Sequence, residues 1–566
     1  STNDLPAFLT ADAAAAGRDI LVPEGTYFIQ NTATITSRLR FEGTITQPLD
    51  KRWVMRNNFD YPSYVDAFGD ETLALQKGLQ ALFGLSDHES FDLRGRRIQL
   101  DEPVDIRALN PTLNNVGARL VIRNGQFEAT DSPGWDPTVV TSTASYAGDN
   151  SKTLTNVTNA ANIEVGSLVT GFGVGREIYV RAVDVDAETI TLNDSAGKAQ
   201  ASQTYTFTRW RYLLDFSGMP RINRFQIDDC EFRCNARANG VLLPDDGIAW
   251  SIRDCWFVRP RERAITSAGR ACQGISIDRN QFVAADNDLP VEQRTSICFN
   301  VNANDAKVRD NRSEQAKTFC IVGGGGHIFV GNHFWNLDDE DDTIGTAGIV
   351  LTNLTPKTTI VGNYIDTMRI ELSPEHRTET AALNNFEDIG QVTITGNIFT
   401  AQMVADWFNY IVIRPPGPGY WIEGLTIDGN TFENFNGGTH DRVDTVDTTF
   451  ADLEHDQTRG LSFRANTYKR VREFTSSPVY LEHTETSANQ VWDIGTDNRL
   501  PFGGRALGVD GVVAHGPSET AGGSPVVTQP FVDTGTGADG NEVKLTWSEP
   551  VKGTVRLFIR SDLPLS

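Results

Sequence analysis

The chain has 566 residues, 22% of them charged, and a formal net charge of −24 at pH 7. Such an acidic chain repels a phosphate backbone, which excludes nonspecific nucleic-acid binding, and we expect no nucleic-acid partner. No apolar run reaches the length of about 20 residues that spans a bilayer, so no membrane insertion is expected. The 50 Gly and 24 Pro residues predict short strands and turns rather than helices.

Residues 1–60 contain short β segments such as ILVPEGTYFI from Ile20. A helix is predicted over Glu71–Phe83, because Asp70 is a suitable N-cap and the leucines that follow share one face. We expect this helix to cap one end of the β structure, and residues 61–137 to contain it together with the first coils. Residues 138–209 hold alternating strands and turns, which predict a small β-barrel or sandwich inserted between coils.

One short phrase then recurs nine times between residues 227 and 468. It consists of an apolar residue, two mostly polar residues, Asn or Cys, any residue, and usually another apolar residue. A strand–turn–strand phrase at such intervals is typical of a solenoid, and its β-branched and aromatic residues indicate a β-solenoid. The Asn or Cys positions are Cys230, Cys255, Asn280, Asn311, Asn332, Asn363, Asn397, Asn430 and Asn466.

The repeat predicts how the coils stack. A single coil cannot bury its inward side chains, so it packs on the next coil at about 4.8 Å. We expect one internal stack at the positions of Ile227 and Ile252, a second at those of Phe232 and Phe257 that only Ser313 interrupts, and hydrogen bonds between the Asn side chains from coil to coil. The solenoid is expected over residues 210–500. Residues 501–566, rich in Gly, Ser, Thr and Pro before a final β segment, are expected to form a capping or trimerisation region.

The six Cys residues all lie in the first half of the solenoid. Side chains stacked in one row point the same way, which is poor geometry for a disulfide. Buried free thiols are therefore expected, in agreement with synthesis in a reducing cytoplasm.

The segments ILVPEGTYFI from Ile20 and FDLRGRRIQL from Phe91, with the Gly-Asn-x-Phe coils, resemble right-handed parallel β-helix proteins of the pectate-lyase-like superfamily. The layout is most similar to bacteriophage tailspikes and to the receptor-binding spikes of gene transfer agents. The resemblance implies an all-β, right-handed parallel β-helix with a capping helix, an inserted β module and a C-terminal β segment. It also implies a homotrimeric spike on a virion or virion-like particle, acting outside the cell on a bacterial surface polysaccharide. The catalytic motifs of polygalacturonases and pectate lyases are incomplete here, so the resemblance transfers no catalytic residue.

Acidic residues recur at one place after the Asn positions of successive coils. Rung stacking brings such loops onto one face, where neighbouring carboxylates reach the separation used by glycosidases. Aromatic rings suit the apolar faces of sugars, and Arg forks suit anionic sugars. The catalytic candidates are Asp339, Asp342, Glu371, Glu375 and Asp406. The candidates for substrate binding are Trp335, Trp407, Tyr410, Arg259 and Arg261.

Several interpretations stay open for these loops. The acidic runs are alternatively only solvated surface, and Asp338–Asp342 is alternatively a Ca²⁺ site, although no metal or cofactor is required. The Arg residues between Arg253 and Arg279 either clamp an anionic glycan or neutralise neighbouring Asp residues. We expect a spike that binds and hydrolyses a bacterial polysaccharide. The alternatives are a non-enzymatic glycan-binding spike and a polysaccharide lyase.

Overall fold

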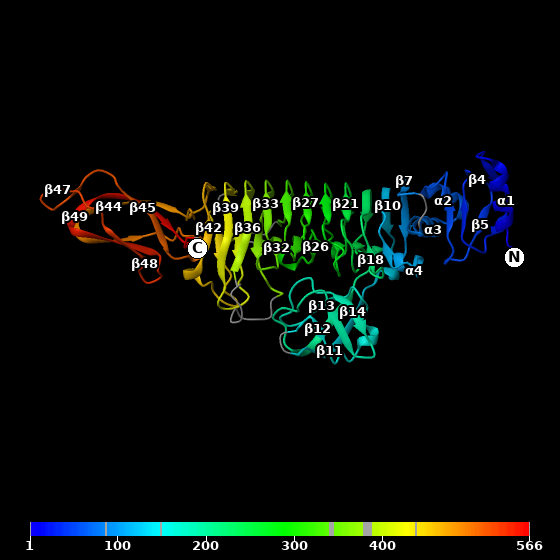
Figure 1. Ribbon diagram of the computed structural model, residues 1–566, viewed down its shortest axis with the longest axis horizontal. Coiled ribbons are helices and arrows are strands. Elements are labelled where there is room, and N and C mark those ends of the chain that lie inside the picture. Colours follow the sequence, from blue (N-terminus) through cyan, green and yellow to red (C-terminus); the bar gives the residue numbers. More distant parts are fainter. Residues whose placement is uncertain are drawn as a thin grey trace. The chain divides into compact units, whose positions relative to one another are not determined.

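The computed structural model of the protein describes residues 2–84, 88–147, 150–338, 344–376, 388–435 and 438–564. Short parallel strands dominate it (Figure 1). The chain divides into two compact units. Unit 1 comprises Ser1–Asp288 and Arg294–Gly324, and unit 2 comprises Leu289–Gln293 and Gly325–Ser566.

Unit 1 begins with helix α1 (Leu5–Ala15) and three pairs of short parallel strands. The same order of three strands occurs twice, which is how two consecutive coils stack. The pairs are β1 (Ile20–Val22) with β4 (Leu39–Phe41), β2 (Thr26–Phe28) with β5 (Thr44–Thr46), and β3 (Ala33–Ile35) with β6 (Trp53–Met55).

Helices α2 (Tyr61–Phe68) and α3 (Glu71–Phe83) follow these strands. The predicted helix is confirmed as α3, and the side chain of Asp70 accepts a hydrogen bond from the backbone N of Leu73 at 2.7 Å. This contact satisfies one of the backbone donors that a helix start leaves open. The buried apolar face of α3 is formed by Leu75, Leu79, Leu82 and Phe83.

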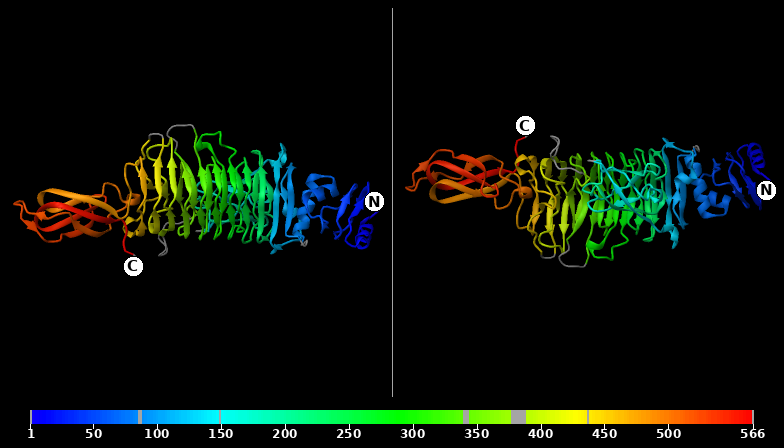
Figure 2. Two further views of the ribbon diagram at one scale, coloured as in Figure 1. Left: turned by 90° about the horizontal axis from the view of Figure 1, so that it is seen from above. Right: turned by 90° about the horizontal axis from the view of Figure 1, so that it is seen from below.

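The coils of unit 1 carry two parallel sheets, in which strands of successive coils lie side by side (Figure 2). The first sheet contains β7 (Ser90–Leu100), β10 (Leu120–Ala129), β19 (Phe225–Arg233), β21 (Ser251–Arg253), β22 (Trp256–Val258), β24 (Ser276–Asp278), β25 (Gln281–Val283), β27 (Lys307–Arg309) and β28 (Arg312–Glu314). The second contains β8 (Val104–Asp105), β17 (Tyr212–Asp215), β20 (Asn239–Leu242), β23 (Arg263–Thr266), β26 (Ile297–Val301) and β29 (Thr318–Val322).

The register of the first sheet confirms the two predicted stacks in unit 1. Ile227 pairs with Ile252, which pairs with Ile277, and all three side chains are buried. In the second stack the rings of Phe232 and Phe257 lie parallel with centroids 4.8 Å apart. Aromatic and aliphatic side chains that repeat at one level of every coil thus form the core of the solenoid.

Ser313 interrupts the second stack, as the sequence predicted, and it occupies the position opposite Phe282. Its side chain is buried, and its Oγ lies 3.1 Å from the Sγ of Cys298 on the second sheet. The hydroxyl therefore has a partner inside the coil, which a buried polar group requires.

A small antiparallel module is inserted between two coils of unit 1, and it has its own core. β11 (Thr138–Ser145) pairs along its whole length with β16 (Ser202–Arg209). Of the aromatic residues in this module, Tyr179 and Tyr205 are buried, whereas Phe172 is exposed. The remaining strands are β12 (Thr153–Leu154), β13 (Leu168–Thr170), β14 (Val180–Asp184) and β15 (Thr189–Leu192).

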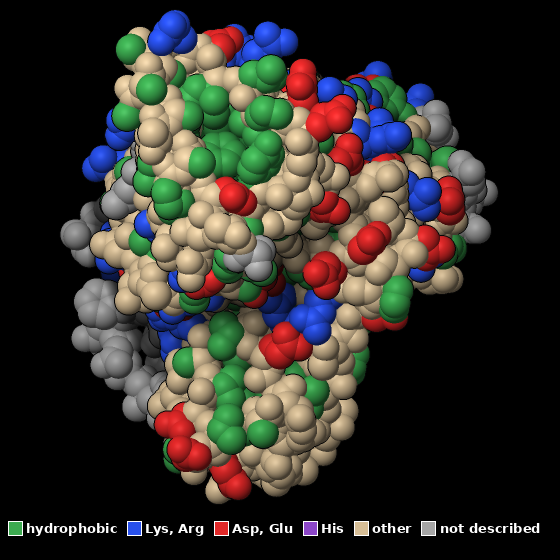
Figure 3. Space-filling view, turned by 90° about the vertical axis from the view of Figure 1, so that its right-hand side faces the viewer, with side chains coloured by type: hydrophobic (Ala, Val, Ile, Leu, Met, Phe, Trp, Pro, Cys, Tyr) green, Lys and Arg blue, Asp and Glu red, His purple; other side chains and the backbone are tan. Residues whose placement is uncertain are grey.

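Ion pairs join this module to the coils. The Nη2 of Arg263 on β23 lies 2.7 Å from Oε1 of Glu177 in the module, and both side chains are buried. The Nε of Arg181 lies 2.6 Å from Oδ1 of Asp245. Figure 3 shows acidic and basic side chains side by side where the module meets the coils. Because a buried charge without a partner is costly, the Arg263–Glu177 pair specifies how the module docks.

Unit 2 continues the same architecture with two parallel sheets. Two rows of side chains pair in register in the first sheet. The first row is Phe329, Ile360, Ile394 and Ile427. The second row, five residues further along each coil, is Phe334, Ile365, Phe399 and Phe432. The fold is therefore an all-β parallel β-helix. The first sheet contains β30 (Ile328–Val330), β31 (His333–Trp335), β33 (Thr358–Val361), β34 (Tyr364–Asp366), β36 (Asp388–Thr395), β37 (Ile398–Ala401), β39 (Trp421–Asp428), β40 (Thr431–Asn434), β42 (Arg459–Ser462) and β43 (Thr467–Lys469). The second contains β32 (Thr346–Leu351), β35 (Met368–Leu372), β38 (Ile411–Ile413) and β41 (Asp444–Val446).

The predicted Asn ladder is present at the turns between the strands of the first sheet. In unit 2 the Nδ2 of Asn363 donates to Oδ1 of Asn397 at 2.9 Å, and the backbone N of Asn363 donates to the same oxygen at 2.9 Å. The residue before each Asn has positive φ, for example 64° at Gly362 and 63° at Gly396. Glycine adopts this conformation at no steric cost, which explains the Gly-Asn pairs of the repeat.

The end of unit 2 is antiparallel. β44 (Val479–Gly495) pairs with β49 (Glu542–Arg560), and β45 (Gly508–Ala514) and β48 (Phe531–Thr536) add to β49. Trp492 and Trp547 lie in the core of this sheet with ring centroids 5.0 Å apart.

All six cysteines are free and buried, as the sequence predicted. Burial raises the pKa of the Cys255 thiol to about 12. Such thiols stay protonated at neutral pH and act as small apolar side chains.

Candidate functional site

In unit 2, the connections between the two sheets differ in length from coil to coil. β34 is joined to β35 by Thr367 alone, with φ of 55°. β37 is joined to β38 by residues 402–410, and β40 to β41 by residues 435–443. Because Ala401 pairs with Asn434 and Ile411 pairs with Asp444, both longer loops leave the solenoid at the same edge.

Two charged side chains on these loops meet a third that follows β43, so that each comes from a different coil. The Nη2 of Arg472 lies 3.0 Å from Oδ2 of Asp406, and its Nη1 contacts Oδ1 of Asp441. The backbone reinforces this arrangement, since the N of Asp441 donates to the carbonyl of Asp406 at 2.9 Å. All three side chains are about half exposed. Exposed ion pairs add at most about 1 kcal/mol to stability, so this cluster offers charged hydrogen-bonding groups more than it stabilises the fold.

Trp407 directly follows Asp406 in the sequence and is 57% exposed. The next residue, Phe408, is buried against Tyr410 with ring centroids 5.2 Å apart. A Cβ on Gly345 would lie 2.4 Å from the Phe408 ring, so Phe408 is closely packed on that side too. Phe408 therefore anchors the loop while Trp407 presents its ring to solvent. We call Asp406, Trp407, Asp441 and Arg472 the Trp407 site.

A buried histidine lies next to the Trp407 site. The His440 ring packs on Phe408 and Tyr410, with centroids 5.5 and 5.1 Å away. Burial lowers the pKa of His440 to about 4, although the charges of Asp406 and Asp441 act in the opposite direction. Within the described part of the chain, neither ring nitrogen has a hydrogen-bond partner. His440 is therefore neutral at pH 7.

The predicted catalytic residues that the structure describes have different surroundings. Asp339 and Asp342 lie outside the described residues. Glu371 on β35 is buried, and its Oε1 lies 2.8 Å from Nη2 of Arg369. Glu375 is half-buried and accepts a hydrogen bond from Oγ of Ser373 at 3.3 Å. Only Asp406 belongs to the Trp407 site.

Two members of the Trp407 site, Asp441 and Arg472, were absent from the predicted set, and so was the neighbouring His440. A signal for Asp441 exists in the repeat, because Asp441 follows Asn430 at nearly the interval at which Asp406 follows Asn397. Arg472 has no such signal. It is 66 residues from Asp406 in the sequence, and only the stacking of coils brings the two together.

The predicted aromatic residues differ in how far they are buried. Trp407 is exposed, and Trp335 is half-buried on β31, in register with Asp366. The prediction of Tyr410 as a sugar platform is wrong, because its ring is fully buried beside Phe399 and Phe432. Its hydroxyl donates to the backbone O of Glu433 at 2.9 Å.

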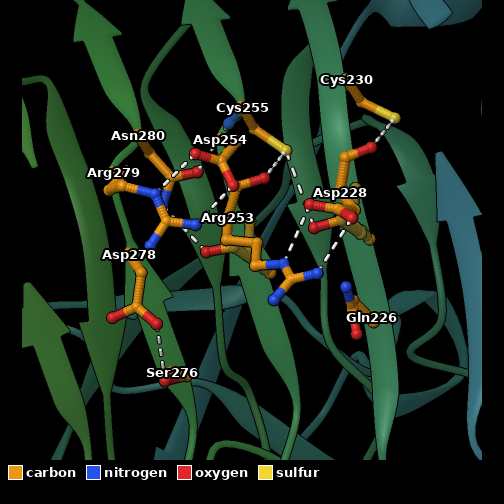
Figure 4. Close-up of polar contacts among 12 residues, drawn as sticks. Gln226, Asp228, Cys230, Arg253, Asp254, Cys255, Ser276, Asp278, Arg279 and Asn280 are labelled. Atoms are coloured by element: carbon orange, nitrogen blue, oxygen red, sulfur yellow. Dashed lines mark hydrogen bonds and ion pairs between the residues drawn. The ribbon is translucent and has the colours of Figure 1, made fainter. Parts of the chain in front are cut away.

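Three of the six Arg residues in the basic patch of unit 1, namely Arg253, Arg263 and Arg279, are paired with acids, which agrees with one of the two interpretations. Arg253 contacts both carboxylate oxygens of Asp228 at 2.9 and 3.1 Å. Arg279 contacts both oxygens of Asp254 at 2.7 and 2.6 Å (Figure 4). Such forks join one coil to the next and occupy the guanidinium groups.

The two Arg candidates for substrate binding lie near this patch. Arg259 is exposed, with φ of 51°. The guanidinium of Arg261 lies over the ring of Trp210, 5.6 Å from its centroid. This is a cation–π contact.

The described residues contain no group of three or more His, Cys, Asp or Glu side chains arranged to hold a metal ion. They also contain no helix that is long and apolar enough to cross a membrane.

No protein-family model and no curated protein matches the chain. Among solved structures, it is similar to the tailspike protein of E. coli bacteriophage HK620 in complex with a pentasaccharide. That match has 10% identity, covers 98% of this chain and 89% of that chain, and has a TM-score of 0.38. The chain is also similar to a double mutant of the same tailspike in complex with pentasaccharide. That match has 11% identity, covers 98% of this chain and 89% of that chain, and has a TM-score of 0.37. Because the identity and the TM-scores are low, the fold and the site are assigned from the chain's own strand pairings and side chains.

Proposed function

We propose that the chain is a spike-type protein that binds a bacterial cell-surface polysaccharide at the Trp407 site. The observation that supports this most is that the exposed Trp407 directly follows Asp406, whose carboxylate shares the Arg472 guanidinium with Asp441. A sugar ring needs an apolar surface for its C–H face and charged or polar groups for its hydroxyls. The Trp407 site offers both on loops that are fixed by Phe408.

Hydrolysis of the bound polysaccharide is the second function that we propose. Its support is that Asp406 and Asp441 both contact one guanidinium, which keeps the two carboxylates within several ångströms of each other, roughly the range of retaining glycosidases. Binding is favoured over hydrolysis, because Arg472 already engages both carboxylates. A lyase has less support, since Arg253 and Arg279 are engaged by Asp228 and Asp254.

A homotrimer that serves as the spike of a virion or virion-like particle is part of this proposal. Its support lies in the C-terminal β region, where Phe531 on β48 is 81% exposed and Val527, in the connection before β48, is 95% exposed. Large apolar side chains at such exposure are typical of surfaces that are covered in an assembly. Light scattering on the full chain tests this: a mass of three chains is expected, and a monomer that persists at high concentration contradicts it.

The function is tested by exposing the full chain to a panel of bacterial surface polysaccharides. Three quantities are followed: binding, the release of reducing ends, and the ultraviolet absorbance of unsaturated sugars. We expect binding that Trp407→Ala weakens about tenfold, as for a central aromatic contact. The matched control is Phe450→Ala, another exposed aromatic residue of unit 2, which should leave binding unchanged.

The same panel separates the three functions. Reducing ends that are lost in Asp406→Asn and Asp441→Asn support hydrolysis, and reducing ends with ultraviolet absorbance indicate a lyase. Binding with no product supports recognition alone. Binding that is equal in the wild type and in Trp407→Ala contradicts the assignment of the site.

A further inference from the structure

Unit 1 carries a second exposed tryptophan, on the outer face of its first sheet. Trp256 on β22 is 53% exposed, whereas the next residue, Phe257, is fully buried. The Phe257 ring is stacked between Phe232 and Phe282, with centroids 4.8 and 5.3 Å away. Because side chains alternate along a strand, this stack fixes the side chain of Trp256 on the outside.

An apolar strip surrounds Trp256 on two successive coils. Val258 lies two residues further along the same strand and is half-buried. On the next coil, Gln281 pairs with Trp256 and Val283 pairs with Val258. We call Trp256, Val258, Gln281 and Val283 the Trp256 strip.

Ion pairs border the Trp256 strip on both sides. On the preceding coil, Glu231 and Arg233 pair in register with Trp256 and Val258, and they contact each other at 2.8 Å. On the following coil, Arg312 and Glu314 pair in register with Gln281 and Val283, and they contact each other at 3.2 Å. Each pair is neutral overall and retains groups that can hydrogen-bond to hydroxyls. The strip is thus a surface with three apolar side chains and Gln281 that lies between two charged borders.

We propose that the Trp256 strip is a second glycan-binding surface, which takes about three residues of a neutral sugar chain lying along the coil axis. Glu231 lies on the first of four successive coils and Arg312 on the last. These two coils are three rungs apart, which is about 14 Å at the usual strand spacing. One rung is close to the length of one pyranose unit, so each sugar meets a new row of side chains. The Trp256 ring stacks on one sugar, and Glu231, Gln281 and Arg312 bind hydroxyls. This inference rests on the proposed recognition of a polysaccharide, but it concerns a separate surface in the other unit.

A neutral glycan fits this strip better than an anionic glycan or a second copy of the chain. Glu231 and Glu314 already neutralise the two guanidinium groups that an anionic sugar would need. A tryptophan buries about 150–250 Å². A stable protein interface buries about 800 Å² per partner, which one tryptophan and two valines do not supply.

The test uses the full chain and neutral maltoheptaose and dextran oligosaccharides as probes, with polygalacturonate as the anionic comparison. Binding is measured by calorimetry and by saturation-transfer NMR. Trp256→Ala should weaken binding of the neutral probes about tenfold. Phe172→Ala is the matched control, because Phe172 is an exposed aromatic residue of unit 1 outside the strip. Circular dichroism and thermal unfolding confirm that each variant is folded.

The outcome for this strip is distinguishable from that for the Trp407 site. In a Trp407→Ala background, residual binding of neutral probes that disappears on adding Trp256→Ala supports the proposal. Binding that Trp407→Ala abolishes and Trp256→Ala leaves unchanged overturns the strip and preserves the proposed function. Loss of self-association in Trp256→Ala, or no binding of neutral probes by the wild type, also overturns it.

Discussion

Asn397 and Asn430 are joined by two hydrogen bonds to one oxygen. The backbone N of Asn397 donates to Oδ1 of Asn430 at 2.9 Å, and the Nδ2 of Asn397 donates to the same Oδ1 at 3.0 Å. The same pair of contacts links Asn363 to Asn397 in the preceding coil. Each Asn thus accepts from one neighbour and donates to the other, so the ladder connects coils that are about 30 residues apart in the sequence.

Replacing Asn397 with Ala should destabilise the solenoid locally by about 3 kcal/mol, because the buried donors of Asn363 lose their acceptor. Hydrogen exchange at the amide of Asn363 measures this directly, since that N–H donates to Oδ1 of Asn397. Asn466→Ala is the matched control. It lies at the end of the ladder and should expose only the donors of Asn430. Equal protection of the Asn363 amide in wild type and Asn397→Ala would contradict a structural role for the ladder.

Replacing Arg472 with Met should separate recognition from stability. The side chain is exposed, so the free energy of unfolding should change little. Polysaccharide binding should fall, because Asp406 and Asp441 lose the cation that holds them together. Arg464→Met removes a comparable exposed pair with Asp428 and should leave binding intact. Unchanged binding in Arg472→Met would remove Arg472 from the Trp407 site.

His440 should make the protein sensitive to mild acid. Its pKa is lowered by burial from 6.5 to about 4, so the folded state binds the proton less well than the unfolded state. The contribution of neutral His440 to the free energy of unfolding is fully present above pH 6.5, and it is lost as the pH falls from 6.5 through about 4. The full loss is about 3 kcal/mol. His440→Phe should flatten the dependence of the melting temperature on pH in this window, whereas the exposed His515→Gln should not.

Glu262 should have the opposite effect to His440 on how stability changes with pH. Burial raises the pKa of its carboxyl above 4.5, although Arg263 opposes the shift. The protonated form is therefore favoured in the folded state, and its stabilisation is present below pH 4.5 and lost as the pH rises through the folded pKa. Glu262→Gln should raise the melting temperature at pH 7 relative to wild type and give no gain below pH 4.5. Glu314→Gln, on the exposed face, serves as the control; an equal gain in both variants would point to net charge instead.

The stacking of coils could be predicted from the sequence because it depends on a fixed offset. Ile252 and Ile277 lie three residues before the Cys or Asn of their coils, and they pair in the structure. The same logic predicted Ser313 opposite Phe282. A solenoid repeats one local rule, so residues with the same position in the phrase occupy the same position in space.

The loops follow no such rule, which is why part of the candidate site was missed. Trp407 and Tyr410 are three residues apart, yet one is exposed and the other is buried. The exposure of each ring depends on which side chain of the loop packs beside Gly345 and His440. That side chain is Phe408. Similarly, the partner of Asp406 is decided by the stacking of a coil that begins much later in the chain.

The inserted module of unit 1 enters and leaves the solenoid at one point, since Thr138 at the start of β11 pairs with Arg209 at the end of β16. The coils on either side therefore need not shift register to accommodate its length. In evolutionary terms, an in-frame exchange that keeps a partner for Arg263 can replace the module while the coils keep their stacking. Chains of this kind can thus change one surface feature at a single genetic locus without a change in how the coils of unit 1 stack.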